Sequence, residues 1–195
     1  MKIPAMIIGG LFLVFLGIQW YSLSNRNTIE KYSFEVVKKY GDFEVRKYNS
    51  GLFTSVELST NDYVNASRKG FSILAGYIFG GNESQQKIAM TSPVRMSIEK
   101  KGMTMMFMVP KQLKKEDLPR PNQSNIEFII EPEQIVAAIS FGGWANSNKI
   151  KEYKNKLKAA LDLEGIEYTN NFSFFGYNPP YDIFFRKNEV VVELK

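Results

Sequence analysis

The sequence predicts an α+β domain in which an antiparallel sheet packs against two helices, with a further apolar helix at the N-terminus. Three observations predict this class. Many short segments alternate apolar and polar residues, two longer segments repeat apolar residues at helical spacing, and the chain begins with an uncharged apolar run. Consecutive hairpins with few helices favour an antiparallel sheet covered by helices.

The apolar run at the N-terminus predicts a transmembrane helix. Residues 3–18 contain no charge, and Trp20 and Tyr21 follow where interfacial aromatic residues are expected. As a helix, about twenty residues would span roughly 30 Å, the thickness of a bilayer core. We predict a membrane anchor or signal sequence over residues 1–24 and a polar linker over 25–31. No clear cleavage site follows the run, so a membrane-anchored domain outside the cytoplasm is favoured over secretion after signal cleavage.

The first half of the domain is predicted to consist of strands on either side of one helix. Asp62 is a suitable N-cap and Gly80-Gly81 a suitable stop, which predicts a helix over residues 62–79. A polar loop over 111–125 follows this half. The predicted strands cover residues 32–40, 43–48, 52–58, 93–98 and 103–109.

The second half repeats the pattern. A helix is predicted over residues 147–164, ending at Gly165, and strand, helix, strand, strand therefore occurs twice along the chain. We expect two pseudo-repeated βαββ units within one domain over residues 32–195. The predicted strands of this half cover residues 126–131, 134–141, 172–177, 183–186 and 190–194.

Composition excludes several functions. The chain has no cysteine and no histidine, which excludes disulfides, thiolate nucleophiles, ordinary zinc sites and triads built on histidine. The net charge of +5 is modest, and no nucleic-acid recognition motif accompanies it, so we predict no nucleic-acid partner. The lysines of the helix over 147–164 are expected on a solvated face. Four methionines between 103 and 108 alternate along a strand and are expected to fill the core.

The helix over 62–79 differs from the second one because it has two apolar stripes. Ala66, Gly70, Ile73 and Tyr77 form one stripe, and Phe71, Leu74, Ala75 and Ile78 form the other. One stripe can pack on the sheet, which leaves the other in need of a cover. Either a loop of the protein covers it, or it forms a shallow apolar groove for a flat ligand with Arg68 at the rim.

Three further motifs occur in order along the chain. Residues 87–94 read KIAMTSPV, where Pro93 favours an extended backbone and the two hydroxyls can cap stray backbone groups. Residues 141–144 read FGGW, and GYNPPY at 176–181 leads into RKNEV at 186–190. As a set, these motifs closely resemble the signature of the SOUL haem-binding family.

The resemblance implies a distorted antiparallel β-barrel with two flanking helices and a bound haem or other tetrapyrrole. It places the ligand beside the first helix and the loop near the Pro-Pro motif, and Arg68 resembles the family's helix arginine. An arginine fork can pair with a haem propionate, while apolar side chains cover the macrocycle. The residues predicted to contact the ligand are Arg68, Phe71, Leu74, Ala75, Ile78, Tyr177 and Pro179.

The absence of histidine and cysteine shapes the expected chemistry. The usual axial ligands of haem iron cannot occur here, so the macrocycle would be held by apolar and ionic contacts, with Tyr77 or Met90 as conceivable ligands. No catalytic set is recognised. Glu57, Glu131, Glu133 and Glu189 are scattered, and Glu189 is expected to pair with Arg186 or a turn amide.

Two alternative functions stay open on the sequence alone, beside a purely structural role as a membrane-tethered domain. The fold also resembles the small-molecule-sensing domains of the GyrI-like class, which suggests a binding module for other amphipathic compounds. The other alternative is a hydrolase or tetrapyrrole-modifying enzyme that uses a carboxylate or a tyrosine.

Overall fold

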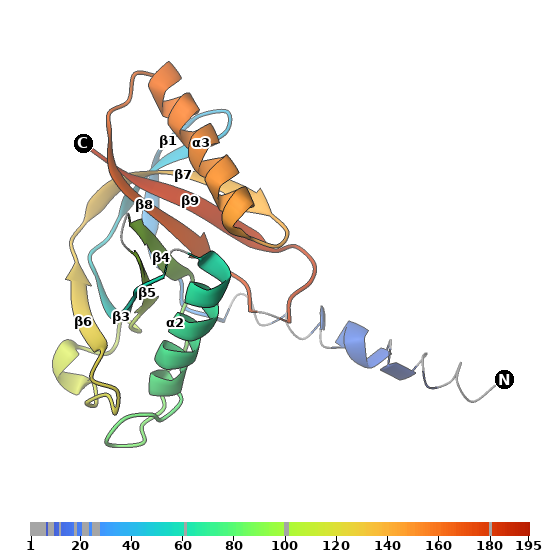
Figure 1. Ribbon diagram of the computed structural model, residues 1–195, viewed down its shortest axis with the longest axis vertical. Helices are drawn as coiled ribbons and strands as arrows, with labels where there is room; N and C mark the ends of the chain where they lie inside the picture. The colour runs from blue at the N-terminus through green and yellow to red at the C-terminus, as the bar shows by residue number, and fades with distance from the viewer. Residues whose placement is uncertain are drawn as a thin grey trace.

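One curled antiparallel sheet of nine strands forms the body of the protein, and two helices cover its outer face (Figure 1). The structure is a computed structural model. It describes residues 28–60, 62–99, 102–179 and 181–195, together with residues 7, 10, 11, 13–17, 19, 20 and 24. The elements are β1 (Phe34–Lys39), β2 (Glu44–Tyr48), β3 (Gly51–Leu58), α2 (Tyr63–Ile78), β4 (Val94–Glu99), β5 (Gly102–Met108), the short 3-10 helix η1 (Lys115–Asp117), β6 (Ile126–Glu131), β7 (Gln134–Gly142), α3 (Ser147–Leu163), β8 (Tyr168–Gly176) and β9 (Lys187–Leu194).

The strand order shows the two βαββ units. The order across the sheet is β1-β2-β7-β9-β8-β4-β5-β3-β6. The first unit consists of β3, α2, β4 and β5, and its strands lie in the order β3-β5-β4. The second unit consists of β7, α3, β8 and β9, and its strands lie in the corresponding order β7-β9-β8. The units join where β4 pairs with β8, so the sheet has an internal pseudo-symmetry.

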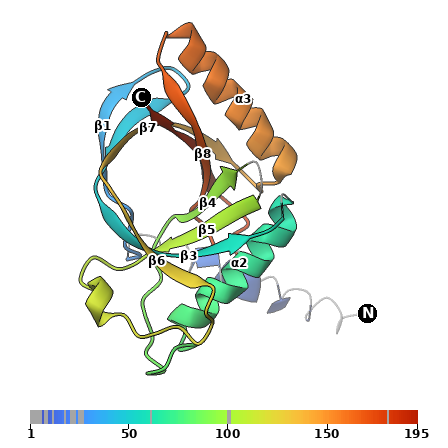
Figure 2. The ribbon, with the colours of Figure 1, turned by 60° about the vertical axis from the view of Figure 1, so that its left-hand side comes forward.

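Side-chain alternation along the strands separates two apolar clusters. On β5, Met103, Met105 and Phe107 face the helices, whereas Met106 and Met108 face the inside of the curl. All four methionines are buried, as predicted for core residues. The larger cluster includes residues of both helices and lies between them and the sheet, and the smaller one lies on the inner side of the curl. Figure 2 shows the strands of the curled sheet as a ring.

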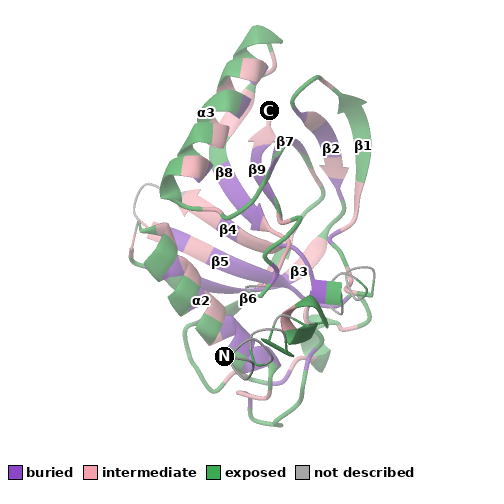
Figure 3. Ribbon diagram, turned by 90° about the vertical axis from the view of Figure 1, so that its right-hand side faces the viewer, coloured by how far each residue is buried: buried purple, intermediate pink, exposed green. Residues whose placement is uncertain are grey.

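Helix α2 lies very close to the sheet because of a glycine. A Cβ built on Gly70 would come within 2.8 Å of Leu58 Cδ1 and 3.1 Å of Met105 Cβ. The helix begins where the Asp62 carboxylate accepts a hydrogen bond from the Asn65 amide at 3.0 Å, as the N-cap prediction required. Figure 3 shows the result, with buried residues on the sheet side of α2 and exposed residues on the other.

The predicted transmembrane helix over residues 1–24 is wrong. Within the described part of the chain, no helix combines the length and the apolarity needed to span a membrane. The other residues of the predicted span, 1–6, 8, 9, 12, 18 and 21–23, lie outside the described residues.

Contacts of Gln19 show how this part of the chain packs instead. Its side chain is buried, donates to the Tyr181 carbonyl at 3.0 Å and accepts from the Ile183 amide at 3.3 Å. Phe15 meets Phe184 edge-on at 6.3 Å between ring centroids. The predictions built on the helix, a membrane-anchored domain and a membrane partner, are therefore corrected as well.

The predicted strand over residues 183–186 is also wrong. These residues belong to the loop between β8 and β9, and Phe185 has a positive φ of 55°. Ile183, Phe184 and Phe185 are exposed, so apolar composition alone suggested a strand where the chain turns.

Candidate functional site

The inner face of helix α2 is used by the protein core. Leu74, Ala75 and Ile78 are 0%, 7% and 4% exposed. Phe71 is half-buried and meets the Phe107 ring of β5 edge-on at 5.4 Å between centroids. The other predicted stripe is also mainly buried, so the sheet and neighbouring loops cover much of both stripes.

An accessible flank of α2 remains on the opposite side. Val64, Arg68, Ser72, Gly76 and Phe79 are exposed and lie within about a third of the helix circumference. We call these five residues the outer flank. A Cβ built on Gly76 would have no neighbour within 4 Å, which leaves the middle of the outer flank flat. Among the described residues, Arg68 has no hydrogen-bond or ion-pair partner.

The segment with the KIAMTSPV sequence lies between α2 and the β8–β9 loop. The Ile88 amide donates to the Ile78 carbonyl at 2.8 Å, which ties this segment to the last turn of α2. The Thr91 hydroxyl donates to the Met108 carbonyl at 2.7 Å, and the Ser92 hydroxyl donates to the Tyr177 carbonyl at 3.5 Å. Both hydroxyls therefore cap backbone groups, as predicted, and connect α2 indirectly to Tyr177.

The loop that contains Tyr177 and Pro179 is tightly cross-linked. The Pro179 carbonyl accepts from Arg186 Nη1 at 2.9 Å and from the Asp182 amide at 3.2 Å. Asn178 accepts from the Lys187 amide at 2.7 Å and donates to the Asp182 carboxylate at 2.8 Å. These contacts make the loop a rigid turn in which Asn178 acts as a cap.

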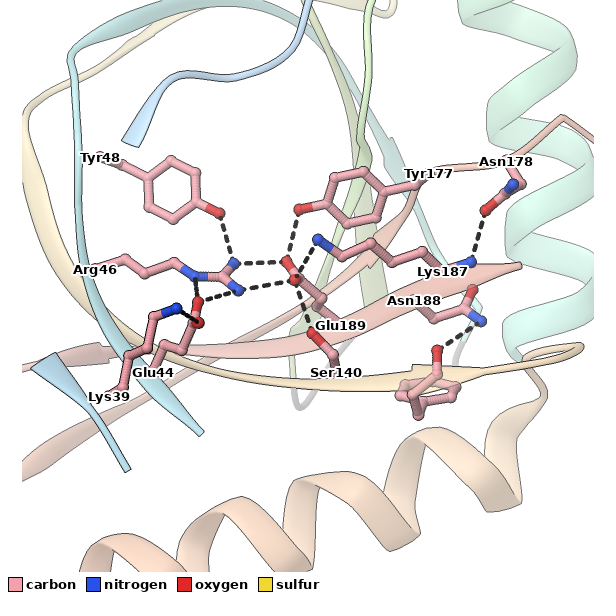
Figure 4. Close-up of polar contacts among 11 residues, drawn as sticks. Lys39, Glu44, Arg46, Tyr48, Ser140, Tyr177, Asn178, Lys187, Asn188 and Glu189 are labelled. Atoms are coloured by element: carbon pink, nitrogen blue, oxygen red, sulfur yellow. Dashed lines mark hydrogen bonds and ion pairs between the residues drawn. The ribbon is translucent and has the colours of Figure 1, made fainter. Parts of the chain in front are cut away.

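The hydroxyl of Tyr177 points into the curl of the sheet, where it meets a buried carboxylate (Figure 4). It donates to Glu189 Oε2 at 2.6 Å, and Glu189 is 0% exposed. Arg46 binds the same carboxylate through Nη1–Oε2 at 2.9 Å and Nη2–Oε1 at 3.0 Å. Ser140 donates to it at 2.9 Å, and Lys187 Nζ lies 3.0 Å away.

These partners determine the protonation states of the cluster. Burial raises the pKa of Glu189, but the hydrogen bonds and charge of Arg46, with Tyr177 and Lys187, outweigh it and lower the pKa to about 2. Burial and the charge of Glu189 raise the pKa of Tyr48 to about 12, and they raise the pKa of Tyr177 as well. The cluster is an ion pair in which the neutral Tyr177 phenol donates to Glu189, while the neutral Tyr48 phenol accepts from Arg46 Nη1 at 3.4 Å. This arrangement suits a structural role better than proton transfer.

Sequence reasoning predicted a structural role for Glu189 but gave the wrong partner. Its partner is Arg46, whereas Arg186 donates to the carbonyls of Pro179 and Asp182 and lies over the Trp144 ring at 4.1 Å. The pairing crosses strand β7, which separates β2 from β9 in the sheet, so only the complete strand order could have revealed it.

No ligand set for a metal is found in the described residues. They contain no group of three or more His, Cys, Asp or Glu side chains able to hold an ion. The Tyr77 hydroxyl donates to the buried Pro119 carbonyl at 2.9 Å, and burial raises its pKa to about 12. Tyr77 is therefore directed away from the outer flank, and Met90 is half-buried against the core.

A cavity of about 1120 Å³ lies inside the curl of the sheet. Glu57, Glu131 and Glu133, three of the four scattered glutamates, line it, and Arg95 bridges to Glu131 at 2.9 Å within it. No residue of α2 contributes to its wall. The sequence alone did not indicate this cavity, because its walls come from strands that meet only after the sheet has curled.

Comparison with known proteins gives both sequence and fold matches. The family profile described as SOUL heme-binding protein matches residues 29–193. The chain is similar to Heme-binding protein 2 of Mus musculus, with 30% identity over 158 residues and 77% of each chain covered. It is also similar to Heme-binding protein 1 of Xenopus laevis, with 27% identity over 155 residues that cover 76% of this chain and 81% of that one.

Among solved structures, the C-terminal domain of EcmrR has a similar fold. The TM-score is 0.63 at 12% identity, and the match covers 78% of this chain and 96% of that domain. At this identity the similarity concerns the fold alone.

Proposed function

This chain belongs to the SOUL heme-binding protein family, and from that membership we propose that it binds haem or a related tetrapyrrole non-covalently. The names of its relatives, Heme-binding protein 1 and 2, support this proposal. Because the chain has neither histidine nor cysteine, it binds the macrocycle through its plane and its carboxylates, without the usual ligands to iron. The role is binding or buffering, with no reaction performed on the ligand.

The outer flank of α2 is the proposed place of binding. Phe79 is 60% exposed and Val64 48%, which offers apolar contact to a flat macrocycle beside the flat surface at Gly76. Arg68 is available to pair with a propionate, and Phe71 borders the flank. Leu74, Ala75 and Ile78 support this surface from beneath, and Tyr177 and Pro179 belong to the rigid loop beyond residues 88–92.

Charge favours this surface over the cavity inside the sheet. Helix α2 contains Arg68 and Lys69 and no acidic residue between Tyr63 and Ile78. The cavity is lined by five carboxylates and three cationic side chains. Because haem has two propionates, its carboxylates are attracted to the helix and repelled from the cavity.

Titration of the 195-residue chain with hemin tests the proposal. We expect saturable one-to-one binding, and we expect Arg68→Glu to weaken it about tenfold, the effect of losing roughly 1.4 kcal/mol of ionic contact. Lys151→Glu on exposed α3 is the matched control and should leave the affinity unchanged. Metal-free protoporphyrin should bind within about threefold of hemin, since no protein ligand to iron contributes.

Two results would contradict the proposal. One is the absence of saturable hemin binding. The other is an equal effect of Arg68→Glu and Lys151→Glu, which would indicate a general response to net charge instead of a contact with Arg68.

A further inference from the structure

The two βαββ units differ in the strands that flank them. Strand β2 pairs with β7 on one side and with β1 on the other, whereas β6 pairs with β3 alone among the described residues. The pseudo-symmetry relates β2 to β6, because each pairs with the first strand of a unit, β2 with β7 and β6 with β3. In the described part of the chain β6 therefore has no counterpart of β1 beside it, and we call this side of β6 its free edge (Figure 1).

Two prolines explain why this strand is missing. Helix α3 begins at Ser147, 84 residues after Tyr63 at the start of α2, so the counterpart of β1 would lie at residues 118–123. These residues read LPRPNQ. Pro119 and Pro121 have no amide to donate to a strand ladder, so the segment is unsuited to pair with β6.

Residues 118–123 pair with the loop after α2 instead. The Glu83 amide donates to the Arg120 carbonyl at 3.0 Å, and the Asn122 amide donates to the Gly81 carbonyl at 3.2 Å. The segment is therefore committed to this loop and leaves the place beside β6 unfilled.

The backbone groups that β6 directs to its free edge follow from the register. The Val109 amide donates to the Leu52 carbonyl at 2.8 Å, so the backbone groups of Leu52 point away from β6. Leu52 lies opposite Ile130, which makes these two a pair without hydrogen bonds between them. Ile130 and, two residues before it, Phe128 therefore direct their amides and carbonyls to the free edge.

This edge has none of the features that usually protect an edge strand. Lysines, prolines and bulges commonly prevent the addition of another strand. The opposite edge strand β1 has Lys38, Lys39 and a bulge between Val36 and Lys38. Strand β6 reads IEFIIE and pairs with β3 without a shift of register, and Ile130 is 65% exposed. The free edge of β6 is therefore suited to accept a further strand.

The side chains of β6 indicate the chemistry of that strand. Phe128 packs on the helix side of the sheet, and Ile130 faces the same side because side chains alternate. Glu127 is exposed on the other face. A strand that alternates apolar and basic residues would place its apolar side chains beside Phe128 and Ile130 and a cation beside Glu127.

We propose that the free edge of β6 binds an extended peptide segment of a partner protein, which pairs with Phe128 and Ile130 and alternates apolar and basic residues. Strand addition of this kind gains affinity from main-chain hydrogen bonds and specificity from alternate side chains. The added strand runs antiparallel to β6, as β1 does to β2. The site shares no residue with the outer flank of α2, so it is independent of the proposed haem site.

Three synthetic peptides test this inference on the 195-residue chain. The peptide TVKVKVT should bind saturably, and binding should shift the amide signals of Phe128 and Ile130 and slow their hydrogen exchange. TVEVEVT should bind about fivefold more weakly or worse, because it places like charge beside Glu127. TVKPKVT keeps the charge but lacks the central amide, and it should bind about tenfold more weakly or worse.

Variants of the chain locate the binding. Ile130→Pro removes an amide at the free edge and leaves the pairing with β3 intact, so it should weaken TVKVKVT binding by about tenfold or more. Ile130→Thr keeps the amide, is the matched control and should retain the affinity within about threefold, with melting curves to verify folding of both. Glu127→Lys should reverse the preference between TVKVKVT and TVEVEVT, whereas Glu35→Lys on exposed β1 should leave it unchanged.

Several results would overturn the inference. They are the absence of saturable TVKVKVT binding, equal binding of TVKPKVT, and equal binding by the Ile130→Pro and Ile130→Thr variants. A chain that sediments as a dimer and protects the Phe128 and Ile130 amides without peptide would identify a second copy as the occupant and would also overturn it. Loss of hemin binding alone would contradict only the proposed function.

Discussion

Arg46 on β2 and Glu189 on β9 form a bidentate ion pair inside the sheet, with N–O distances of 2.9 and 3.0 Å. Strand β7 lies between their strands, so the pair connects side chains across a neighbouring strand. Glu189 also accepts the Tyr177 hydroxyl, which fixes the start of the β8–β9 loop. The buried Glu189 carboxylate therefore connects strand β2 in the core of the sheet to the β8–β9 loop, which lies beside the proposed haem site.

Removing one partner of this pair should strongly destabilise the fold. We expect Arg46→Met to lower the free energy of unfolding by about 3–5 kcal/mol, because it leaves the buried Glu189 charge without its bidentate partner and with the half-exposed Lys187 as its remaining cation. Arg46→Met/Glu189→Leu should recover most of this loss, since no charge is then left uncompensated. Urea unfolding measures both. Glu152→Gln, which breaks the exposed pair with Lys156, is the control and should cost less than about 0.5 kcal/mol. A single Arg46 variant as stable as this control would contradict the account.

Stability should decrease in acid because of Glu189. Its pKa is lowered from 4.5 to about 2 in the folded chain, so the folded state binds fewer protons than the unfolded state between these values. The stabilisation is present above about pH 4.5 and is lost as the pH falls toward 2, with a magnitude on the order of 3 kcal/mol. Urea unfolding at pH 6 and pH 3 should show a larger decrease for the wild type than for Arg46→Met/Glu189→Leu. Equal decreases would show that other carboxylates cause the acid sensitivity.

Tyr177→Phe should lower the stability of the fold and leave hemin binding almost unchanged. The variant loses the hydrogen bond of 2.6 Å to Glu189 and keeps the ring, so we expect a loss of about 1.5–3 kcal/mol in unfolding free energy. Because the hydroxyl points into the sheet, hemin affinity should change by less than about twofold. A large loss of hemin affinity with unchanged stability would place the hydroxyl at the ligand instead.

Two glycines of α2 should respond in opposite directions to alanine. At Gly70 the new Cβ would meet Leu58 and Met105 of the core, so we expect a loss of about 1–3 kcal/mol. At Gly76 the space is open, and the better helix propensity of alanine should stabilise the fold by about 0.5–1 kcal/mol. Thermal unfolding of the two variants compares them directly. A stabilising Gly70→Ala would contradict the close approach of α2 to the sheet.

Local signals made much of the fold predictable. The helices predicted over 62–79 and 147–164 are observed at Tyr63–Ile78 and Ser147–Leu163, because caps and glycine stops act within a few residues. Strand alternation predicted the two βαββ units in the same way. The transmembrane helix and the strand over 183–186 were wrong because both rested on apolar composition, which does not reveal what the segment packs against.

The candidate sites were less predictable because they depend on distant contacts. The seven residues predicted to contact the ligand include Leu74 and Ile78, which face the core, and omit Val64 and Phe79, which are exposed. Helical spacing groups residues into stripes but does not say which stripe the sheet covers. The Arg46–Glu189 pair and the cavity around Glu57 and Glu127 arise from strands far apart in sequence, so strand pairing had to be known first.

Paramagnetic broadening of backbone amide signals tests the position of haem on this chain most directly. Ferric hemin broadens amides close to its iron, whereas metal-free protoporphyrin at the same site does not. The account predicts that broadening is confined to residues 63–79 and 88–92, beside Arg68 and Phe79. Broadening centred on Ser55, Thr104 and Ser173 would place haem inside the sheet and contradict the account.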